Sequence, residues 1–108
     1  MMIKGVGVDI ISVERFDRVL QKHGDRLLNT YFAKEEREMP LLSLAARFAA
    51  KEAVKKALNT PKISFKDIFI PSPAKEAVLR NIDIDGRILV SISHEKTMAV
   101  AVAIWESD

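Results

Sequence analysis

The sequence predicts an α+β fold in which helices pack on a mostly antiparallel sheet. Three features lead to this expectation. A strand pattern opens the chain at residues 3–10, a long helical pattern covers residues 41–58, and two strand patterns at residues 87–93 and 98–105 close it. Consecutive strands joined by short turns pair in the antiparallel direction, and helices grouped between such strands cover a face of their sheet.

The first forty residues are expected to form one strand followed by helical segments. Valine and isoleucine alternate with glycine and aspartate in residues 3–10, which is the two-residue period of a strand. Ser12 can cap the helix that follows, and Gly24 is a typical stop signal for that helix. Residues 26–39 are predicted to be helical in pieces, because Pro40 interrupts them.

Residues 41–58 carry the strongest helical pattern, since they are rich in Ala, Leu, Lys and Glu, and Asn59-Thr60-Pro61 ends it. Asp85-Gly86 is a typical hairpin turn. The other elements expected after the helix are a strand at residues 63–70, a short helical segment at 75–81, a short strand at 82–84, and strands at 87–93 and 98–105.

The composition is typical of one soluble globular domain covering residues 1–108. Seventeen Lys and Arg residues against 15 Asp and Glu residues give a formal net charge of +2, and 48% of the residues are hydrophobic. The chain has no cysteine. Disulfides, thiolate zinc sites, iron–sulfur clusters and cysteine nucleophiles are therefore excluded.

Neither a nucleic-acid nor a membrane partner is expected. Aromatic residues make up only 6% of the chain, and charges of both signs are mixed, unlike the dense basic stripe of a nucleic-acid binder. The longest apolar run, Met98 to Trp105, is far shorter than the roughly 20 residues that span a bilayer. Lys4 and Asp9 interrupt the apolar N-terminal stretch, so no signal peptide is predicted and a cytoplasmic protein is expected.

Two glycines share a face of the first strand with an acid. Gly5, Gly7 and Asp9 are two residues apart, so their side chains point the same way. Glycine weakens a strand, and two on one face suggest that something approaches closely there. One interpretation is that Asp9 holds a hard cation such as Mg²⁺ beside a phosphate. The other is that the glycines admit a packed helix and Asp9 helps to start the next helix.

The first helix has an apolar seam and a basic ridge on opposite faces. The ridge consists of Arg15, Arg18, Lys22 and, if the helix extends that far, Arg26. Acidic residues such as Glu14 do not interleave within the ridge as pairing at a spacing of four residues would prefer. The ridge is interpreted as a docking surface for an acidic protein or a polyphosphate, with an ordinary solvated helix face as the alternative.

The central helix carries an acid on an alanine-rich face. Glu52 is flanked by Ala45, Ala49 and Phe48, and Lys56 lies one turn further along, where it can pair with Glu52. A carboxylate packed against apolar surface needs a partner, a cation or a metal; a surface ion pair is the alternative. Three further cations lie on the adjoining side and can serve anionic oxygens. These are Arg47, Lys51 and Lys55.

The closing strands offer a histidine and a two-sided apolar strand. His94 follows Ser93 at the end of the penultimate strand and is a base, a phosphate donor or a turn residue. In the last strand, Met98, Val and Ile residues line one face and alanines the other. A chain of about 100 residues leaves much apolar surface exposed, so a homo-oligomer is expected.

Three motifs together resemble the holo-[acyl-carrier-protein] synthase family, the small single-lobe class of 4′-phosphopantetheinyl transferases. The motifs are Gly5-Val6-Gly7-Val8-Asp9, Arg47-Phe48-Ala49-Ala50-Lys51-Glu52-Ala53-x-x-Lys56-Ala57, and Ser91-Ile92-Ser93-His94 before the final strand. Their order and spacing cover nearly the whole chain, which would then be one such domain. The two-lobed class repeats this fold in one chain, whereas 108 residues hold one copy.

The resemblance implies transfer of the phosphopantetheine arm of coenzyme A to a serine of apo acyl carrier protein, with release of 3′,5′-ADP. It implies Mg²⁺ as cofactor and a trimer with active sites between subunits. The residue roles that it implies are metal ligation by Asp9 and Glu52, catalysis by Glu52 and Lys56, coenzyme A binding by Arg47, Lys56, Ser93 and His94, and carrier-protein binding by Arg15, Arg18 and Lys22.

The sequence departs from the family's pattern at three places. Ala33 stands where Thr is usual in the segment Phe32–Glu36, Asn59-Thr60-Pro61 replaces a glycine-rich turn, and the chain is short before Leu41. The Thr-to-Ala departure at Ala33 leaves the role of Glu36 open. The identity of the base that accepts the serine proton is also left open. The alternative function is a non-catalytic module that binds an acidic protein through the basic ridge and does not need Asp9 and Glu52 together.

Overall fold

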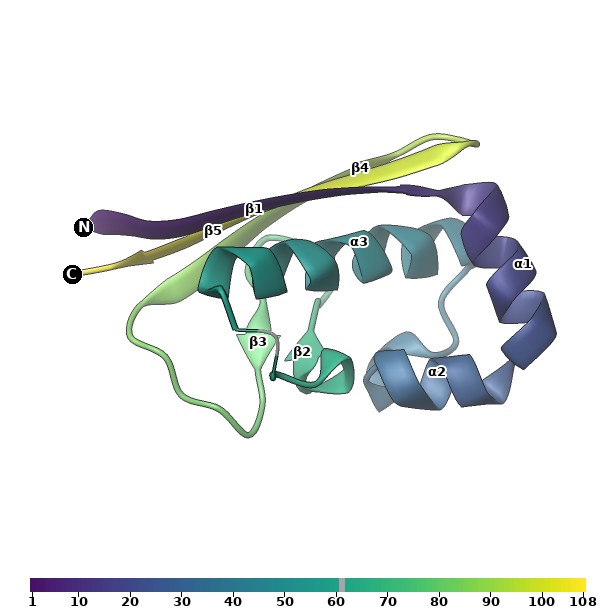
Figure 1. The fold of residues 1–108 in the computed structure, drawn as a ribbon, viewed down its shortest axis with the longest axis horizontal. Coiled ribbons are helices and arrows are strands. Elements are labelled where there is room, and N and C mark those ends of the chain that lie inside the picture. The colour runs from purple at the N-terminus through teal and green to yellow at the C-terminus, as the bar shows by residue number, and fades with distance from the viewer. Residues whose placement is uncertain (61) are drawn as a thin grey trace.

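The computed structural model describes residues 1–60 and 62–108. Five strands, three α-helices and two single-turn 3₁₀ helices are defined in that part of the chain (Figure 1). In chain order they are β1 (Met2–Ser12), α1 (Val13–His23), α2 (Asp25–Tyr31), a 3₁₀ helix (Lys34–Glu36), α3 (Leu41–Leu58), a second 3₁₀ helix (Phe65–Asp67), β2 (Ile68–Phe69), β3 (Val78–Leu79), β4 (Arg87–His94) and β5 (Met98–Ser107).

The three long strands form an antiparallel sheet in the order β1-β5-β4, and β2 and β3 form a separate two-stranded sheet. Helix α3 runs along one face of the large sheet, while α1 and α2 turn away at one end of it (Figure 1). The predicted α+β class, with helices on an antiparallel sheet, is confirmed.

Helix α3 touches the backbone of β1 because two glycines make room for it. A Cβ atom added to Gly5 would lie 1.9 Å from the carbonyl oxygen of Ala57, and one added to Gly7 would lie 1.9 Å from that of Ala53. Contacts this short are impossible for a real side chain. The interpretation that the glycines admit a packed helix is therefore confirmed.

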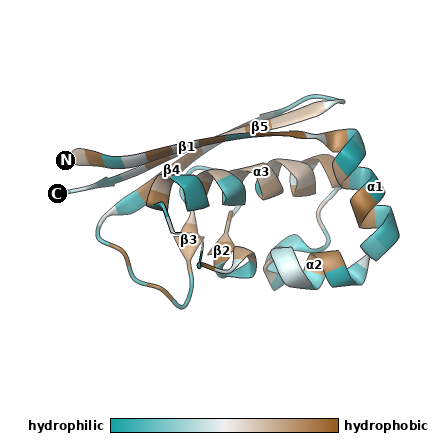
Figure 2. Cartoon of the chain, in the orientation of Figure 1, coloured by the Kyte–Doolittle hydropathy of each residue, from teal (hydrophilic) through white to brown (hydrophobic). Residues whose placement is uncertain are grey.

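The alternation predicted for β5 is also confirmed. Ala99, Ala101 and Ala103 face the interior and are at most 1% exposed. The other face of the sheet carries apolar side chains that are open to solvent, among them Val6, Val8, Ile10 and Val100. Figure 2 shows the hydrophobic colour running along β1. The sheet thus has one covered and one uncovered apolar face.

A second core lies where α1 and α2 meet the start of α3. Phe16 and Phe32 are buried there, with their ring centres 6.2 Å apart. Phe48 joins them from α3, 5.6 Å from the Phe16 ring.

Among the described residues, no helix is long and apolar enough to cross a membrane.

Several boundaries agree with the sequence analysis. The Ser12 hydroxyl accepts a hydrogen bond from the Arg15 backbone nitrogen at 3.2 Å, so it caps α1 as predicted. Helix α1 ends before Gly24, and α3 spans the predicted residues 41–58. Asn59 ends α3 in the left-handed conformation, with φ of 52°.

Three predicted elements were wrong. Residues 63–70 form a 3₁₀ turn and the two residues of β2 instead of one long strand, because the carbonyls of Phe65 and Ile68 bond to Lys51 rather than to a neighbouring strand. The helical segment expected at residues 75–81 contains β3. Residues 82–84 are not a strand, because the backbone of residues 75–77 bonds to the edge of β4 instead: the Ala77 nitrogen donates to the Ile88 carbonyl, and the Val90 nitrogen donates to the Lys75 carbonyl.

Candidate functional site

An acid and a lysine meet where α3 lies against β1. The Lys56 Nζ atom is 3.2 Å from the Asp9 Oδ1 atom and donates to the Val8 carbonyl oxygen at 2.9 Å. Asp9 is the more enclosed of the two, with 17% of its side chain exposed against 53% for Lys56. The lysine predicted to pair with Glu52 pairs with Asp9 instead, because the glycines let α3 approach β1 closely enough for its side chain to span the gap.

Glu52 lies one turn before Lys56 on the same side of α3 and is half-buried. Its neighbours Ala45 and Ala49 are fully buried, so the alanine-rich face packs as predicted. The fold therefore brings Asp9, Glu52 and Lys56 to one region between the edge strand β1 and α3. Within residues 1–60 and 62–108, no group of three or more His, Cys, Asp or Glu side chains could hold a metal ion.

Two of the cations beside Glu52 bond to the protein's own backbone. Arg47 is 5% exposed and donates from Nε to the Ile70 carbonyl at 3.0 Å and from one terminal nitrogen to the Pro71 carbonyl at 3.2 Å. Burial lowers the pKa of Arg47 and of Lys51, while the Glu36 carboxylate opposes that effect at both groups. Lys51 is fully buried. Lys51 was expected to serve an anionic oxygen, and the oxygen that it contacts is one of the protein's own carboxylates.

Glu36 supplies that oxygen from a fully buried position. The Lys51 Nζ atom is 2.7 Å from Glu36 Oε1. Glu36 also accepts hydrogen bonds from the backbone nitrogens of Ala33 at 2.8 Å and Ile70 at 3.0 Å. It joins the segment before α3 to the segment after it. The sequence analysis did not predict this structural role of Glu36. The signal available in the sequence was an acid four residues after Phe32, which is a core residue.

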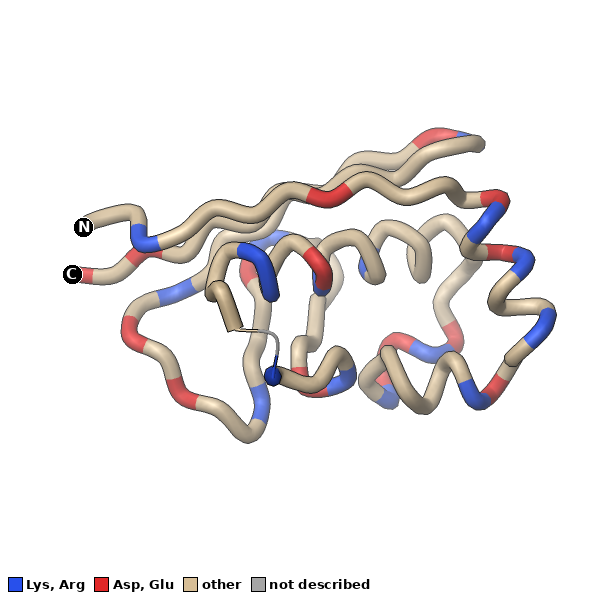
Figure 3. The backbone as a smooth tube through the Cα atoms, viewed as in Figure 1, with Lys and Arg blue, Asp and Glu red and all other residues tan. Residues whose placement is uncertain are grey.

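The ridge of α1 is less uniform than predicted. Arg18 pairs with Glu14 at 3.1 Å, one turn away, so the expectation that the acids do not interleave was wrong. Figure 3 shows acidic and basic positions mixed along α1. Arg26 lies in α2, because α1 ends at His23. Lys22 and Arg15 are exposed on α1.

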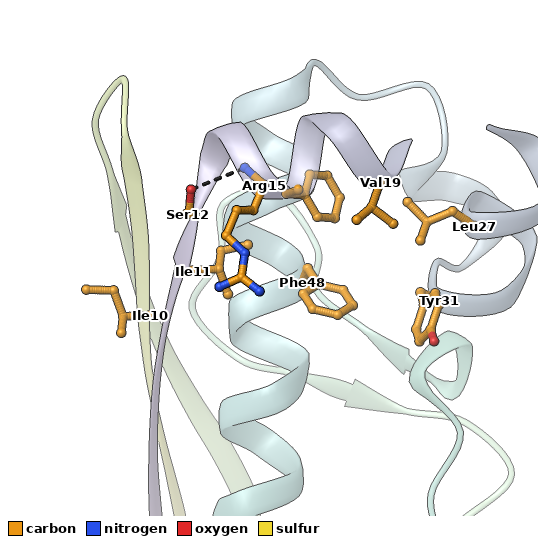
Figure 4. Close-up of a pocket in the computed structure, with 9 residues that line it drawn as sticks. Ile10, Ile11, Ser12, Arg15, Val19, Leu27, Tyr31 and Phe48 are labelled. Atoms are coloured by element: carbon orange, nitrogen blue, oxygen red, sulfur yellow. Dashed lines mark hydrogen bonds between the residues drawn. The ribbon is translucent and has the colours of Figure 1, made fainter. Parts of the chain in front are cut away.

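Arg15 points into an apolar groove. Its guanidinium lies between Ile11 and Phe48, at the mouth of a cavity of about 370 Å³ (Figure 4). The far side of this cavity is formed by Val19, Leu27 and Tyr31. Phe48 lies one turn before Glu52, so the groove adjoins the region of Asp9 and Glu52.

Ser93 and His94 lie at the opposite edge of the sheet. Both are exposed at the end of β4, which β5 separates from β1. They line a shallow cavity of about 270 Å³ together with Ile10 and Val100. A single chain thus holds the predicted site residues in two groups, one beside α3 and one at the end of β4.

Comparison with known proteins relates the chain to one enzyme family. The model of the 4′-phosphopantetheinyl transferase superfamily matches residues 5–104. The chain belongs to the holo-[acyl-carrier-protein] synthase family of that superfamily. It is 64% identical to the holo-[acyl-carrier-protein] synthase of Coprothermobacter proteolyticus over 108 residues, which is the whole of both chains.

Solved structures of the family share this fold. The Bacillus anthracis synthase, solved in complex with CoA (3′,5′-ADP), is 32% identical with a TM-score of 0.81 over the whole of both chains. The Neisseria meningitidis synthase is 30% identical with a TM-score of 0.83, covering 98% of this chain and all of that one. The resemblance given by the sequence motifs, and the enzyme class that it implies, are confirmed.

Proposed function

We propose that this enzyme transfers the 4′-phosphopantetheine group of coenzyme A to a serine of apo acyl carrier protein and releases 3′,5′-ADP. The observation that carries the proposal is the meeting of Asp9 and Lys56 beside Glu52, in a chain that aligns end to end with holo-[acyl-carrier-protein] synthases. The serine oxygen forms a bond to the phosphorus that bears pantetheine. The bond from that phosphorus to 3′,5′-ADP breaks, and the serine proton passes to a base.

Asp9 and Glu52 are the residues proposed to hold Mg²⁺. Carboxylate oxygens are the ligands that Mg²⁺ prefers, and one or two of them commonly suffice when substrate phosphates complete the shell. Asp9 is partly enclosed and already lies beside a cation, which suits it to an ionic role. When bound, the metal would neutralise charge that develops on the diphosphate.

Lys56 is proposed to bind a phosphate oxygen and to stabilise negative charge during transfer. Its ammonium is held by the Val8 carbonyl and the Asp9 carboxylate and is half exposed to an incoming anion. Two of the three guanidinium nitrogens of Arg47 donate hydrogen bonds to backbone carbonyls. Its contact with coenzyme A would use the remaining terminal nitrogen.

Ser93 and His94 are proposed to contact coenzyme A from a second chain. They line a cavity with Ile10 and Val100 on the uncovered side of the sheet, whereas Asp9 points toward Lys56 of α3, so one subunit holds them apart from its own Asp9. The uncovered sheet face, with Val6, Val8 and Val100 open to solvent, gives a second copy a surface to bury. We propose a cyclic trimer in which each active site draws on two chains.

The carrier protein is proposed to dock on the ridge of α1. Arg15 is best placed, because its guanidinium points toward the groove beside α3. Lys22 would extend the contact, and Arg18 would exchange its internal partner Glu14 for an acid of the carrier. We also propose that residues 1–108 act as a single domain in the cytoplasm.

The test combines the protein with coenzyme A, apo acyl carrier protein and Mg²⁺, followed by intact mass of the carrier. A gain of one phosphopantetheine group is expected, together with 3′,5′-ADP. Asp9→Asn and Glu52→Gln should each abolish transfer while the circular dichroism spectrum stays unchanged. Binding of carrier protein without any mass gain would instead support the non-catalytic alternative.

Light scattering tests the shared site. The native protein should be an oligomer, and Val102→Asp should yield a monomer without transferase activity. A dilute monomer that retains full activity would contradict the shared site but leave the transfer reaction intact.

A further inference from the structure

One cation beside the proposed site is oriented by an aromatic ring. The Nζ atom of Lys55 in α3 lies 4.1 Å from the centre of the Phe65 ring. The face of an aromatic ring attracts a cation through its quadrupole, which directs the ammonium without cancelling its charge. Lys55 is half-buried, so its direction is constrained while its charge stays available to a ligand.

The ring that orients Lys55 is itself held on several sides. The Phe65 ring stacks on Phe48 with centres 5.6 Å apart and planes 5° apart. Tyr31 packs against it edge to face at 5.0 Å. The Phe65 carbonyl accepts a hydrogen bond from buried Lys51 at 3.0 Å. The side chain and the backbone of Phe65 are therefore both held against α3. The Phe65 ring thus has a fixed position beneath the Lys55 ammonium.

Among the described residues Lys55 has no carboxylate partner, unlike the neighbouring lysines Lys51 and Lys56 of the same helix. Within residues 1–60 and 62–108, no Asp or Glu oxygen lies within 4.0 Å of its Nζ atom, whereas other cations are paired with acids at that distance. Those pairs are Arg18 with Glu14, Lys51 with Glu36, Lys56 with Asp9 and Arg80 with Glu35. An anion that binds here would be the counter-ion that Lys55 lacks.

Helix geometry directs this ammonium toward Glu52. Lys55 and Lys56 follow Glu52 by three and four residues, which is about −60° and +40° around the helix axis at 100° per residue. Side chains of a helix lean toward its N-terminus, so both lysines lean back toward the turn of Glu52. Lys56 is held on the side of β1 by Val8, and Lys55 on the other side by Phe65.

We propose that Lys55 binds the diphosphate of coenzyme A, as the second of two cations that flank Glu52. This inference rests on the proposed function and adds a binding residue to it. Both phosphoryl groups of a diphosphate carry negative charge on their oxygens, so cations on two sides neutralise it better than Lys56 alone. Charge-assisted contacts between ammonium and phosphate oxygens are among the stronger hydrogen bonds in proteins.

Titration calorimetry with coenzyme A in Mg²⁺ buffer tests the assignment on the 108-residue chain. Lys55→Met keeps an apolar stem over Phe65 and removes the charge, and Lys55→Arg keeps the charge. Lys75→Met is the matched control, because Lys75 is exposed in the segment before β3 and its loss changes the net charge equally. Lys55→Met should raise the Kd for coenzyme A about five- to tenfold. Lys55→Arg and the control should stay within about twofold.

Dephospho-coenzyme A separates the diphosphate from the 3′-phosphate. The same loss with this ligand is expected, since it retains the diphosphate. A loss confined to coenzyme A itself would overturn the assignment to the diphosphate. Equal affinity in Lys55→Met and native protein, or an equal loss in Lys75→Met, would overturn the role of Lys55 while the proposed function stands. Native protein that binds no coenzyme A would overturn both.

Discussion

The buried pair Glu36–Lys51 allows a sharp prediction about stability. Lys51→Met replaces the cation by a side chain of similar length that fits an irregular apolar site. It leaves the Glu36 carboxylate fully buried with backbone donors from Ala33 and Ile70 but without a cation. The variant therefore leaves an uncompensated charge in the interior.

The expected loss is a large share of the total stability. Removing one partner of a buried ion pair typically costs about 3–5 kcal/mol. The carbonyls of Phe65 and Ile68 also lose the Lys51 donor, at about 1–3 kcal/mol for each group left unsatisfied in the interior. Since native domains are stable by only about 5–15 kcal/mol, we expect Lys51→Met to lose about 5 kcal/mol or more and to lie near the limit of folding.

Urea unfolding followed by the fluorescence of Trp105, the single tryptophan, measures this loss. All variants are compared at one protein concentration, because assembly would stabilise the folded chain. The control is the double variant Glu36→Gln/Lys51→Met, in which neither member of the pair carries a charge and the amide oxygen of Gln can still accept from Ala33. The double variant should be more stable than Lys51→Met by about 1–3 kcal/mol. A double variant that is less stable than Lys51→Met would refute the reasoning.

Three more predictions concern the packing of α3, the pH dependence of stability and the carrier surface. Gly7→Ala places a Cβ atom 1.9 Å from the Ala53 carbonyl oxygen, so it should lower the melting temperature in circular dichroism, by the equivalent of about 1–3 kcal/mol, and abolish transfer. A hydrogen bond from Arg80 lowers the pKa of Glu35 from 4.5 to about 2. The native protein should therefore be more stable than Glu35→Gln above pH 4.5, and the difference between their urea unfolding midpoints should vanish near pH 2. Arg15→Glu should weaken binding of acyl carrier protein more than binding of coenzyme A in calorimetry, and salt should weaken the carrier complex further; equal losses would assign Arg15 to the nucleotide site.

The sequence was most informative where one periodic pattern decided the structure. The alanine-rich run at residues 41–58 has no breaker inside it, so α3 could be predicted with its bounds. Ser12 capped α1 because its hydroxyl reaches the backbone of Arg15, a contact between residues three apart. Such local contacts are visible in a linear sequence, as is the alternation of alanine with larger residues in β5.

Long-range side-chain bonds could not be predicted in the same way. Lys51 donates hydrogen bonds to the carbonyls of Phe65 and Ile68, which are 14 and 17 positions away. The strand expected at residues 63–70 is therefore replaced by a 3₁₀ turn and a two-residue strand. Lys56 bonds to Asp9, 47 positions away, in place of its neighbour Glu52. A helical spacing of four predicts that two side chains are close, but not that a third residue from another element competes for one of them.

The dipeptide Lys51-Glu52 links the stability of the protein to its proposed chemistry. Successive residues of a helix point about 100° apart, so Lys51 can be fully buried while Glu52 stays half-buried on the next side of α3. The rotation of α3 about its axis is fixed from two directions, by the glycines of β1 on one side and by Glu36 on the other. A turn of the helix that released Lys51 would also carry Glu52 away from Asp9. The buried pair therefore sets the direction in which the proposed metal ligand points, and substitutions at Glu36 should affect transfer although Glu36 lies outside the site.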